Sequence, residues 1–242
     1  MKLTEENPYL NVIKILGIEV KQLDKFNTVL YILMEVGKSD WEKEVYRRNL
    51  IQNYYTEEEL IDILTSLVST FSYLQGKGIS HRDVKPQNIV FFEKNKNRNK
   101  NMYKITDFGE AKIRKKSEIL DNFEKNTSKQ TVRGTELYMS PLLFNALRNR
   151  GVIDVQYNPY KSDVYSLGLC LLLAACLSYI PLYQIREINS YEKAKCIIEG
   201  YLNPRYSKKF INFILLMLQI DEKLRPDFIG LNSLIRNNFF CK

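Results

Sequence analysis

Hydrophobic periodicity divides the chain into a short β-rich beginning and a longer, mainly helical remainder. β-branched and aromatic residues dominate Val12–Lys21 and Thr28–Met34, which predicts two strands joined by a polar turn. The segment Glu57–Gln75 instead places its apolar residues at helical spacing. One stripe of this segment contains Leu60, Ile63, Leu64, Leu67, Phe71 and Leu74. Thr56 precedes it, with Glu59 three residues further on, so we expect an amphipathic helix that opens with a capping box.

The most hydrophobic stretch, Tyr165–Tyr183, allows two interpretations, a membrane span and a buried helix. It is short for a span, and Lys161 and Asp163 lie immediately before it. A helix that is apolar on every side is also typical of the centre of a protein core. We therefore predict a buried helix over Lys161–Tyr179 and no contact with a membrane.

The remaining apolar patterns are shorter. Tyr191–Tyr201 and Lys208–Gln219 have the spacing of amphipathic helices, and a short final helix is expected near Leu231–Asn237. Ile89–Phe92 and Met102–Ile105 are β-rich. No internal repeat interrupts this order, which favours a single domain.

Two strings of residues carry the chemistry. Residues 81–88 read HRDVKPQN, and residues 107–109 read DFG. The first string places an acid at Asp83, a cation at Lys85 and an amide at Asn88. Together the two strings resemble the catalytic loop and metal-binding turn of eukaryotic-type protein kinases, of the serine/threonine kind. The resemblance covers nearly the whole chain.

The resemblance implies an α+β, protein-kinase-like fold in one domain over residues 1–242. Residues 37–242 would form a mostly helical large lobe, and residues 1–36 a remnant of the small β lobe with about two strands and the hinge. The sequence contains no G-x-G-x-x-G, and Lys14 is too close to Met34 to be the ATP-anchoring lysine. We therefore expect the chain to be incomplete at its N-terminus.

Phosphoryl transfer depends mainly on positioning and on neutralisation of charge. By resemblance, Asp83 accepts the proton of the attacking hydroxyl, and Lys85 neutralises the transferred phosphoryl group. Asn88 and Asp107 would hold the Mg²⁺ ions that bridge the phosphates of ATP, because oxygen ligands suit this cation. Taken singly, an Asp or Asn in a loop is usually an ordinary turn former.

The segment after the second strand resembles the kinase hinge. Backbone groups of Glu35 and Gly37 would hydrogen-bond the adenine, and Met34 would be the gatekeeper residue behind it. The alternative is that these residues form only a strand end and a turn.

Other motif residues are expected to pack against one another or to hold the catalytic loop in place. The only histidine, His81, suggests acid–base chemistry, but in the family this position packs on the phenylalanine found here as Phe108. Gly109 completes that turn. Asp163 resembles the aspartate that anchors the backbone of the catalytic loop, since a buried carboxylate requires donors.

The chain is polar and irregular from the DFG turn to about Lys129, after which residues 130–141, QTVRGTELYMSP, resemble the end of a kinase activation segment. Thr135 within it is typical of serine/threonine kinases. Arg82 would grip Thr131 after its phosphorylation by an upstream kinase, because a guanidinium pairs well with phosphate. The alternative is that Thr131 is an unmodified loop residue.

One position departs from the family pattern. Leu142 stands where most kinases have a glutamate that pairs with the arginine found here as Arg225. We expect Arg225 to find another acid or water, and the activation segment to be less rigid.

The charge composition bears on which kinds of partner the chain could bind. With 36 basic and 28 acidic residues the net charge is +8, which suits an anionic partner such as nucleotide, nucleic acid or a membrane surface. Much of the excess lies in residues 93–101 (EKNKNRNKN) and 112–116 (KIRKK). Because no aromatic residue interrupts the first run, solvated loops are favoured over a nucleic-acid site.

The four cysteines are Cys170, Cys176, Cys196 and Cys241, and they match no zinc spacing. The first residues have no apolar signal-peptide core, so an intracellular, cytoplasmic location is expected. The predicted function is an ATP- and Mg²⁺-dependent kinase acting on serine or threonine hydroxyls of protein substrates, of doubtful activity without the missing strands. The alternative is a catalytically silent pseudokinase that serves as a protein-binding module.

Overall fold

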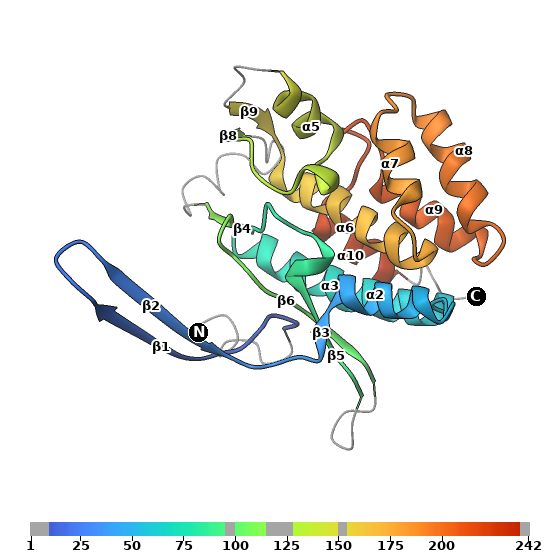
Figure 1. Cartoon of the computed structure of the whole chain (residues 1–242). Helices are drawn as coiled ribbons and strands as arrows, with labels where there is room; N and C mark the ends of the chain where they lie inside the picture. Colours follow the sequence, from blue (N-terminus) through green and yellow to red (C-terminus); the bar gives the residue numbers. More distant parts are fainter. Residues whose placement is uncertain (1–9, 95–99, 115–127, 150–153, 238–242) are drawn as a thin grey trace.

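The computed structural model describes residues 10–94, 100–114, 128–149 and 154–237. A helical body makes up most of the molecule, and one two-stranded ribbon extends from its side (Figure 1). The α-helices of the described residues are α2 (Trp41–Leu50), α3 (Glu57–Gly76), α5 (Pro141–Arg148), α6 (Pro159–Cys176), α7 (Ile180–Arg186), α8 (Tyr191–Leu202), α9 (Lys208–Met217) and α10 (Phe228–Arg236). Helices and small sheets together confirm the predicted α+β class.

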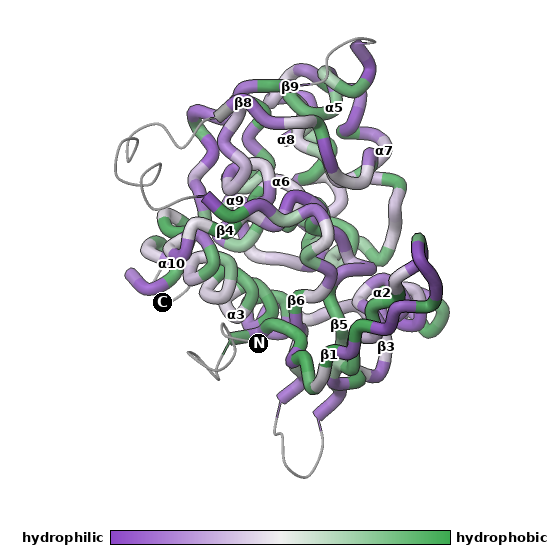
Figure 2. Tube along the Cα trace, turned by 90° about the vertical axis from the view of Figure 1, so that its left-hand side faces the viewer, coloured by the Kyte–Doolittle hydropathy of each residue, from purple (hydrophilic) through white to green (hydrophobic). Residues whose placement is uncertain are grey.

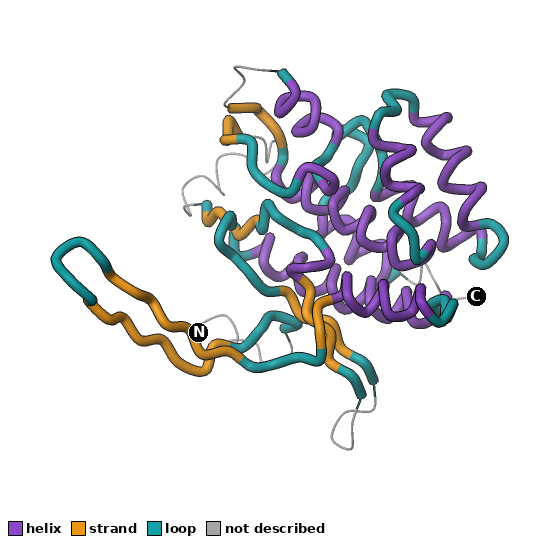
Figure 3. The backbone as a smooth tube through the Cα atoms, in the orientation of Figure 1, coloured by secondary structure: helices purple, strands orange, loops and turns teal. Residues whose placement is uncertain are grey.

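Small antiparallel sheets connect the helices (Figure 3). The ribbon is β1 (Ile15–Gln22) with β2 (Thr28–Met34), and the three-stranded sheet has the order β3 (Ser39–Asp40), β5 (Ile89–Phe92), β6 (Met102–Ile105). The two remaining pairs are β4 (Ile79–Ser80) with β7 (Lys112–Ile113), and β8 (Ser128–Thr131) with β9 (Asp154–Tyr157). Two short 3₁₀ turns, η1 (Pro86–Asn88) and η2 (Glu136–Tyr138), complete the description. Strands β5 and β6 have the predicted bounds.

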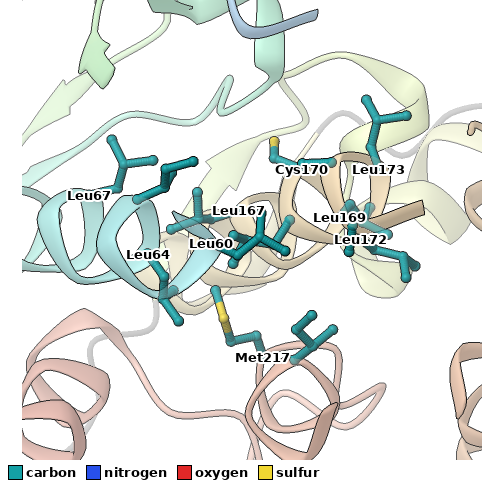
Figure 4. Close-up of a cluster of buried hydrophobic side chains, with 14 of the residues drawn as sticks. Leu60, Leu64, Leu67, Leu167, Leu169, Cys170, Leu172, Leu173 and Met217 are labelled. Carbon is teal, nitrogen blue, oxygen red and sulfur yellow. The ribbon is translucent and has the colours of Figure 1, made fainter. Parts of the chain in front are cut away.

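Helix α6 lies in the middle of the body, and nearly all of its side chains are buried. Figure 4 shows leucines of α3 and α6 packed together with Met217 of α9. The predicted buried helix is confirmed, although it begins at Pro159, after the Asn158 N-cap, and ends at Cys176. Leu177 adopts a left-handed conformation, with φ of 51°, which stops the helix before the predicted Tyr179. None of the helices in the described residues has both the length and the hydropathy needed to cross a membrane.

Helix α3 has the predicted capping box. The Thr56 hydroxyl accepts from the Glu59 amide at 3.1 Å, and the Glu59 carboxylate accepts from the Thr56 amide at 2.9 Å. Because two free amides at the helix start are satisfied in this way, the helix begins where the sequence indicates. It continues one residue beyond the predicted end, to Gly76, and Gly78 turns the chain with φ of 76°.

Residues 11–13, shortly before β1, are anchored to the body. The predicted strand start at Val12 is wrong, because Val12 bridges Ile105 of β6 in parallel. The Ile13 amide donates to the Ile105 carbonyl, and the Ile105 amide donates to the Asn11 carbonyl, both at 2.8 Å. The Asn11 amide also donates to the Thr70 hydroxyl of α3 at 3.2 Å. The ribbon therefore leaves from an anchored segment and starts only at Ile15.

Other boundaries shift by a few residues. Helices α8 and α9 end at Leu202 and Met217, and α10 starts at Phe228 instead of Leu231. The helices α2, α5 and α7 and the short strands β3, β4, β7, β8 and β9 were not predicted; α5 and α7 are short, and α2 is mostly polar. Strand β8 starts at Ser128, inside the stretch expected to be irregular as far as Lys129.

The β1–β2 ribbon exposes apolar side chains. Its register places Ile18 opposite Ile32 and Val20 opposite Leu30. These four side chains share one face and are between 45% and 65% exposed. In Figure 2, hydrophobic segments are visible along this ribbon at the rim of the molecule. Each of the other sheets has a strand packed against a helix, whereas among the described residues β1 and β2 pack mainly against each other.

Candidate active site

Asp83 occupies the loop between β4 and η1, where it contacts three other predicted site residues. Its Oδ1 accepts from the Thr135 amide at 2.9 Å and from the Thr135 hydroxyl at 2.8 Å. Its Oδ2 lies 2.7 Å from Lys85 Nζ and accepts from Asn88 Nδ2 at 3.1 Å. The Asn88 amide also donates to the Asp83 carbonyl at 2.9 Å. An acid, a cation, an amide and a hydroxyl thus form one cluster.

The surroundings keep Asp83 ionised. Burial alone would raise its pKa, but hydrogen bonds from Lys85 and Thr135 outweigh burial, and the pKa lies below its usual value. Lys85 Nζ also donates to the Thr135 hydroxyl at 2.8 Å, so that hydroxyl is oriented from both sides. The result is a fixed, charged carboxylate with the properties of a hydroxyl-orienting base.

Asp163, in the first turns of α6, holds the start of the same loop. Its Oδ2 accepts from the His81 amide at 2.8 Å, and its Oδ1 accepts from the Arg82 amide at 2.9 Å. The carboxyl group is buried, and burial raises its pKa to about 7 despite these two bonds. Arg82 needs this support because it has φ of 69°, a backbone conformation that is costly for residues other than glycine.

The His81 ring packs in the core, and its Nδ1 accepts from the Asp83 amide at 3.4 Å. Its Nε2 lies 3.0 Å from the Thr106 carbonyl, and its ring centre lies 5.0 Å from that of Phe108 at 51°, a tilted contact. Burial lowers the pKa of His81, so the ring is neutral at physiological pH. The structure thus brings His81 and Phe108 together by their side chains.

Asp107 follows β6 with φ of 58°, and its side chain is exposed. Its Oδ1 accepts from the Gly109 amide at 3.2 Å, and a Cβ at Gly109 would lie only 3.1 Å from this oxygen. The Thr106 amide donates to the Asn88 carbonyl at 2.9 Å, which connects the two segments that carry Asn88 and Asp107. Both predicted metal ligands are therefore held by short, local contacts.

The described residues contain no group of three His, Cys, Asp or Glu side chains able to hold a metal. Mg²⁺ is commonly bound by only one or two protein carboxylates together with substrate phosphates. One exposed carboxylate, Asp107, and one amide oxygen, that of Asn88, fit this requirement. The Asn88 amide nitrogen donates to Asp83, so the amide oxygen is the atom of this side chain that is left for a cation.

The predicted hinge connects the ribbon to the body. Met34 ends β2, and the Glu35 amide donates to the Lys14 carbonyl at 3.0 Å. Glu35 Oε1 accepts from the Lys14 amide at 2.8 Å and from Lys104 Nζ of β6 at 2.6 Å. Lys14 precedes β1, so its expected place within a strand is wrong.

Gly37 lies against β5. A Cβ at this position would lie 2.3 Å from Val90 Cγ1 and 2.8 Å from the Phe91 carbonyl oxygen. The amide of Lys38 donates to the same carbonyl at 2.8 Å. No side chain fits here without displacing the strand, so glycine permits the close approach of this segment to the body.

Arg82 and Thr131 are also adjacent. Arg82 Nη2 donates to the Thr131 carbonyl at 2.7 Å and to the Thr131 hydroxyl at 3.2 Å. Arg82 Nε is buried and has no hydrogen-bond partner within the described residues. Gly134 approaches the Arg82 carbonyl so closely that a Cβ would lie 2.8 Å from its oxygen.

The expectation that Arg225 would find another acid or water is wrong. Its guanidinium donates to main-chain carbonyls, at 2.6 and 2.9 Å to Gln219, at 3.0 Å to Lys161 and at 3.3 Å to Ile220. Burial lowers the pKa of Arg225 to about 10. Arg225 thereby connects the start of α6 to the residues after α9, while Leu142 is partly exposed.

Arg186 of α7 was not identified from the sequence. Its Nη1 donates to the Leu137 carbonyl at 2.9 Å and lies 3.5 Å from the Met139 carbonyl. Its guanidinium lies 3.7 Å from the centre of the Phe144 ring. These contacts hold the segment that follows Thr135. Nothing in the local sequence could have revealed them, since the partners lie 47 to 49 positions apart.

A model of the protein kinase domain matches residues 2–240. The chain belongs to the protein kinase domain family. Relatives of this kinase domain include the probable serine/threonine-protein kinases nek3 and nek2 of Dictyostelium discoideum, each 31% identical, over 83% and 90% of this chain. The serine/threonine-protein kinase Nek4 of Mus musculus is 32% identical over 87% of this chain. The predicted family and its serine/threonine type are confirmed.

These relatives are much longer proteins. The kinase domain described here spans 16% of nek3, 46% of nek2 and 23% of Nek4. The match therefore covers less than half of the length of each of these relatives.

Proposed function

We propose that this domain transfers the γ-phosphate of ATP to serine and threonine hydroxyls of protein substrates. The Asp83 cluster carries the proposal. An ionised carboxylate held by Thr135 and Lys85 can orient an attacking hydroxyl and accept its proton. The Lys85 ammonium can also neutralise charge on the phosphoryl group as it moves.

Asn88 and Asp107 would hold Mg²⁺, and the backbone of Glu35 and Gly37, with Met34 behind it, would hold the adenine. The magnesium–nucleotide complex supplies the phosphoryl group when bound. The exposed Asp107 carboxylate and the oriented Asn88 amide support this assignment. The ion pair of Glu35 with Lys104 supports the hinge by fixing the segment at the edge of the body.

We further propose that residues 1–36 contribute to the small lobe and hinge, and residues 37–242 form the large lobe. The exposed apolar face of the β1–β2 ribbon supports this division, since such a face is expected to pack on further structure. The alternative function, a silent pseudokinase that binds partner proteins, is favoured by one observation. The sequence has no G-x-G-x-x-G to cover the phosphates.

The contact between Thr131 and Arg82 supports a proposed regulation through Thr131. Phosphorylation by an upstream kinase would place a doubly charged group beside the guanidinium, whose Nε is unpartnered within the described residues. The new pair would fix β8 against the catalytic loop.

Radiolabel transfer to a generic basic protein tests the function. The assay compares residues 1–242 with a longer protein in which small-lobe strands of a relative precede β1. Transfer by the longer protein, lost in its Asp83→Asn variant, supports the proposal. Absence of transfer despite a folded protein and bound nucleotide would favour the pseudokinase.

A further inference from the structure

The turn η2 links Thr135 to the residues that follow it, and side chains of two helices hold this turn. The Tyr138 amide donates to the Thr135 carbonyl at 2.9 Å, which closes the turn. The Tyr138 carbonyl accepts from the Ser166 hydroxyl of α6 at 2.7 Å, and the Leu137 carbonyl accepts from Arg186 Nη1 of α7 at 2.9 Å. Because buried main-chain carbonyls require donors, α6 and α7 together fix the position of Thr135.

Arg186 ends α7, and its half-buried guanidinium makes its contacts with the chain that follows Thr135. Nη1 also lies 3.5 Å from the Met139 carbonyl, and the guanidinium lies 3.7 Å from the centre of the Phe144 ring. Its Nη2 is buried without a hydrogen-bond partner among the described residues. Since an unpaired buried donor costs free energy, an apolar side chain would serve the packing here at least as well. The carbonyls that it holds therefore explain the guanidinium.

The chain needs such an anchor because the usual one is missing. Leu142 stands where the kinase pattern has a glutamate, and Arg225 donates to main-chain carbonyls elsewhere. We propose that Arg186 takes over this anchoring function and positions Thr135, and through it the Asp83 carboxylate, from α7. Arg186 is then a positioning residue for phosphate transfer, a role that rests on the proposed kinase function. It reaches Asp83 only through the two hydrogen bonds that Thr135 donates.

Arg148 of α5 provides a matched comparison. Its guanidinium lies 4.5 Å from the centre of the same Phe144 ring and donates to the Glu187 carboxylate of α7 at 2.6 and 2.8 Å. Both side chains of this pair are more than half exposed, so the pair contributes little to stability. Arg148 thus joins the same two helices, but among the described residues it donates no hydrogen bond to the turn.

Steady-state transfer to a serine peptide by the protein extended with small-lobe strands tests the proposal. Arg186→Met should lower kcat about tenfold, because loss of a hydrogen bond from a charged donor releases the turn. KM for ATP should change little, since the predicted hinge lies in another part of the molecule. Arg186→Lys retains a donor and should fall between the wild type and Arg186→Met. Arg148→Met is the control and should keep the wild-type rate.

Two further measurements distinguish positioning from a general loss of stability. Burial would raise the pKa of Asp83, and hydrogen bonds from Lys85 and Thr135 hold it below its usual value. Release of Thr135 in Arg186→Met should therefore move the acid limb of the pH–rate profile to higher pH. In a Thr135→Val background, Arg186→Met should cost less than about twofold, because two changes that act through one contact are not additive. An undiminished loss in that background would overturn the proposal.

Hydrogen exchange of the Thr135 amide tests the same link in residues 1–242 without catalysis. This amide donates to Asp83, so its exchange reports directly on the contact. Exchange should become about tenfold faster in Arg186→Met, in proportion to the free energy of the lost hydrogen bond, and stay unchanged in Arg148→Met. Thermal unfolding checks that each variant is folded. If Arg186→Met does not fold, Arg186→Lys and Arg148→Lys provide the same comparison.

The outcomes separate the two proposals. Faster exchange in Arg186→Met, without transfer by any extended protein, would retain the link from Arg186 to Asp83 and remove the kinase function. Transfer with equal rates and equal acid limbs in Arg186→Met and Arg148→Met would retain the kinase function and overturn the role of Arg186. A rate for Arg186→Lys no higher than that for Arg186→Met would also overturn it, because the donated hydrogen bond would not be the cause.

Discussion

Asp83 and Thr135 are joined twice through one carboxylate oxygen, by the Thr135 amide at 2.9 Å and by its hydroxyl at 2.8 Å. The two residues are 52 positions apart, on the catalytic loop and on the segment that follows Gly134. The orientation of the proposed base therefore depends on the position of a second segment. A change that moves Thr135 away from the loop would release Asp83 to rotate.

Replacement of the proposed base and metal ligand should abolish phosphate transfer. In the protein extended with small-lobe strands, Asp83→Asn should lower the transfer rate by ~10²–10⁴-fold, because an amide cannot accept the hydroxyl proton. Asp107→Asn should be at least as harmful, since it removes a charged ligand of Mg²⁺. Asp154→Asn, a side chain on β9, is the control, and unchanged transfer in Asp83→Asn would contradict the assignment.

The hydroxyl group of Thr135 should contribute more to the rate of phosphate transfer than its methyl group. Thr135→Ser keeps both hydroxyl contacts, to Asp83 and to Lys85, and should retain most transfer. Thr135→Val removes both, and loss of a bond to a charged group should lower the rate about tenfold or more. The same loss should raise the pKa of Asp83, so the acid limb of the pH–rate profile should move to higher pH. Equal rates and equal profiles for the two variants would refute this role.

The buried Asp163 should make the protein less stable as the pH rises. Its pKa is about 7 in the folded chain, against 3.8 for an exposed group, so the folded state retains a proton that the unfolded state has lost. The resulting stability is fully present below pH 3.8 and is lost as the pH approaches 7. Urea unfolding over this range should show wild type losing stability relative to Asp163→Asn. His81, whose lowered pKa acts in the opposite direction, is common to both proteins. If stability depends on pH in the same way in the wild type and in Asp163→Asn, the Asp163 carboxyl group is ionised throughout this range.

Arg225 should stabilise the fold mainly through its hydrogen bonds to main-chain carbonyls. Arg225→Met keeps the volume but leaves carbonyls of Gln219, Lys161 and Ile220 without their donors. We expect the free energy of unfolding to fall by about 2–4 kcal/mol. Arg236→Met, at an exposed position of α10, should change it by less than about 0.5 kcal/mol. Similar changes in the free energy of unfolding for the two variants would mean that the cost of burying the guanidinium equals the contribution of its hydrogen bonds.

The β1–β2 ribbon should be the first site of proteolysis. An isolated two-stranded ribbon is marginally stable, and Phe26 at its turn is 90% exposed. Brief chymotrypsin digestion should cut before about Asp40 and leave a resistant core, identified by mass spectrometry. Cleavage distributed evenly along residues 55–235 would show that the body does not fold independently of the ribbon.

Local signals were sufficient for much of this domain. The apolar stripe and capping box of α3, and the continuous apolar run of α6, predicted the two central helices because each depends on residues within a few turns. The HRD and DFG strings likewise indicated the family, since the order of their residues is itself a local property. Short helices such as α7 were missed because seven residues carry too little periodic signal.

Contacts between distant residues were beyond the reach of local patterns. The sequence determined that Arg225 lacked its usual glutamate, but only the packing of α6 against the chain after α9 supplied three carbonyls in its place. The same holds for Glu42, whose partners Gln87 and Tyr179 lie 45 and 137 positions away. In α3 and α6, hydrophobic spacing specifies which residues are buried, because burial there requires only an apolar side chain on the correct face. The partner of a buried polar group depends on which backbones approach each other, and the tertiary structure alone decides that.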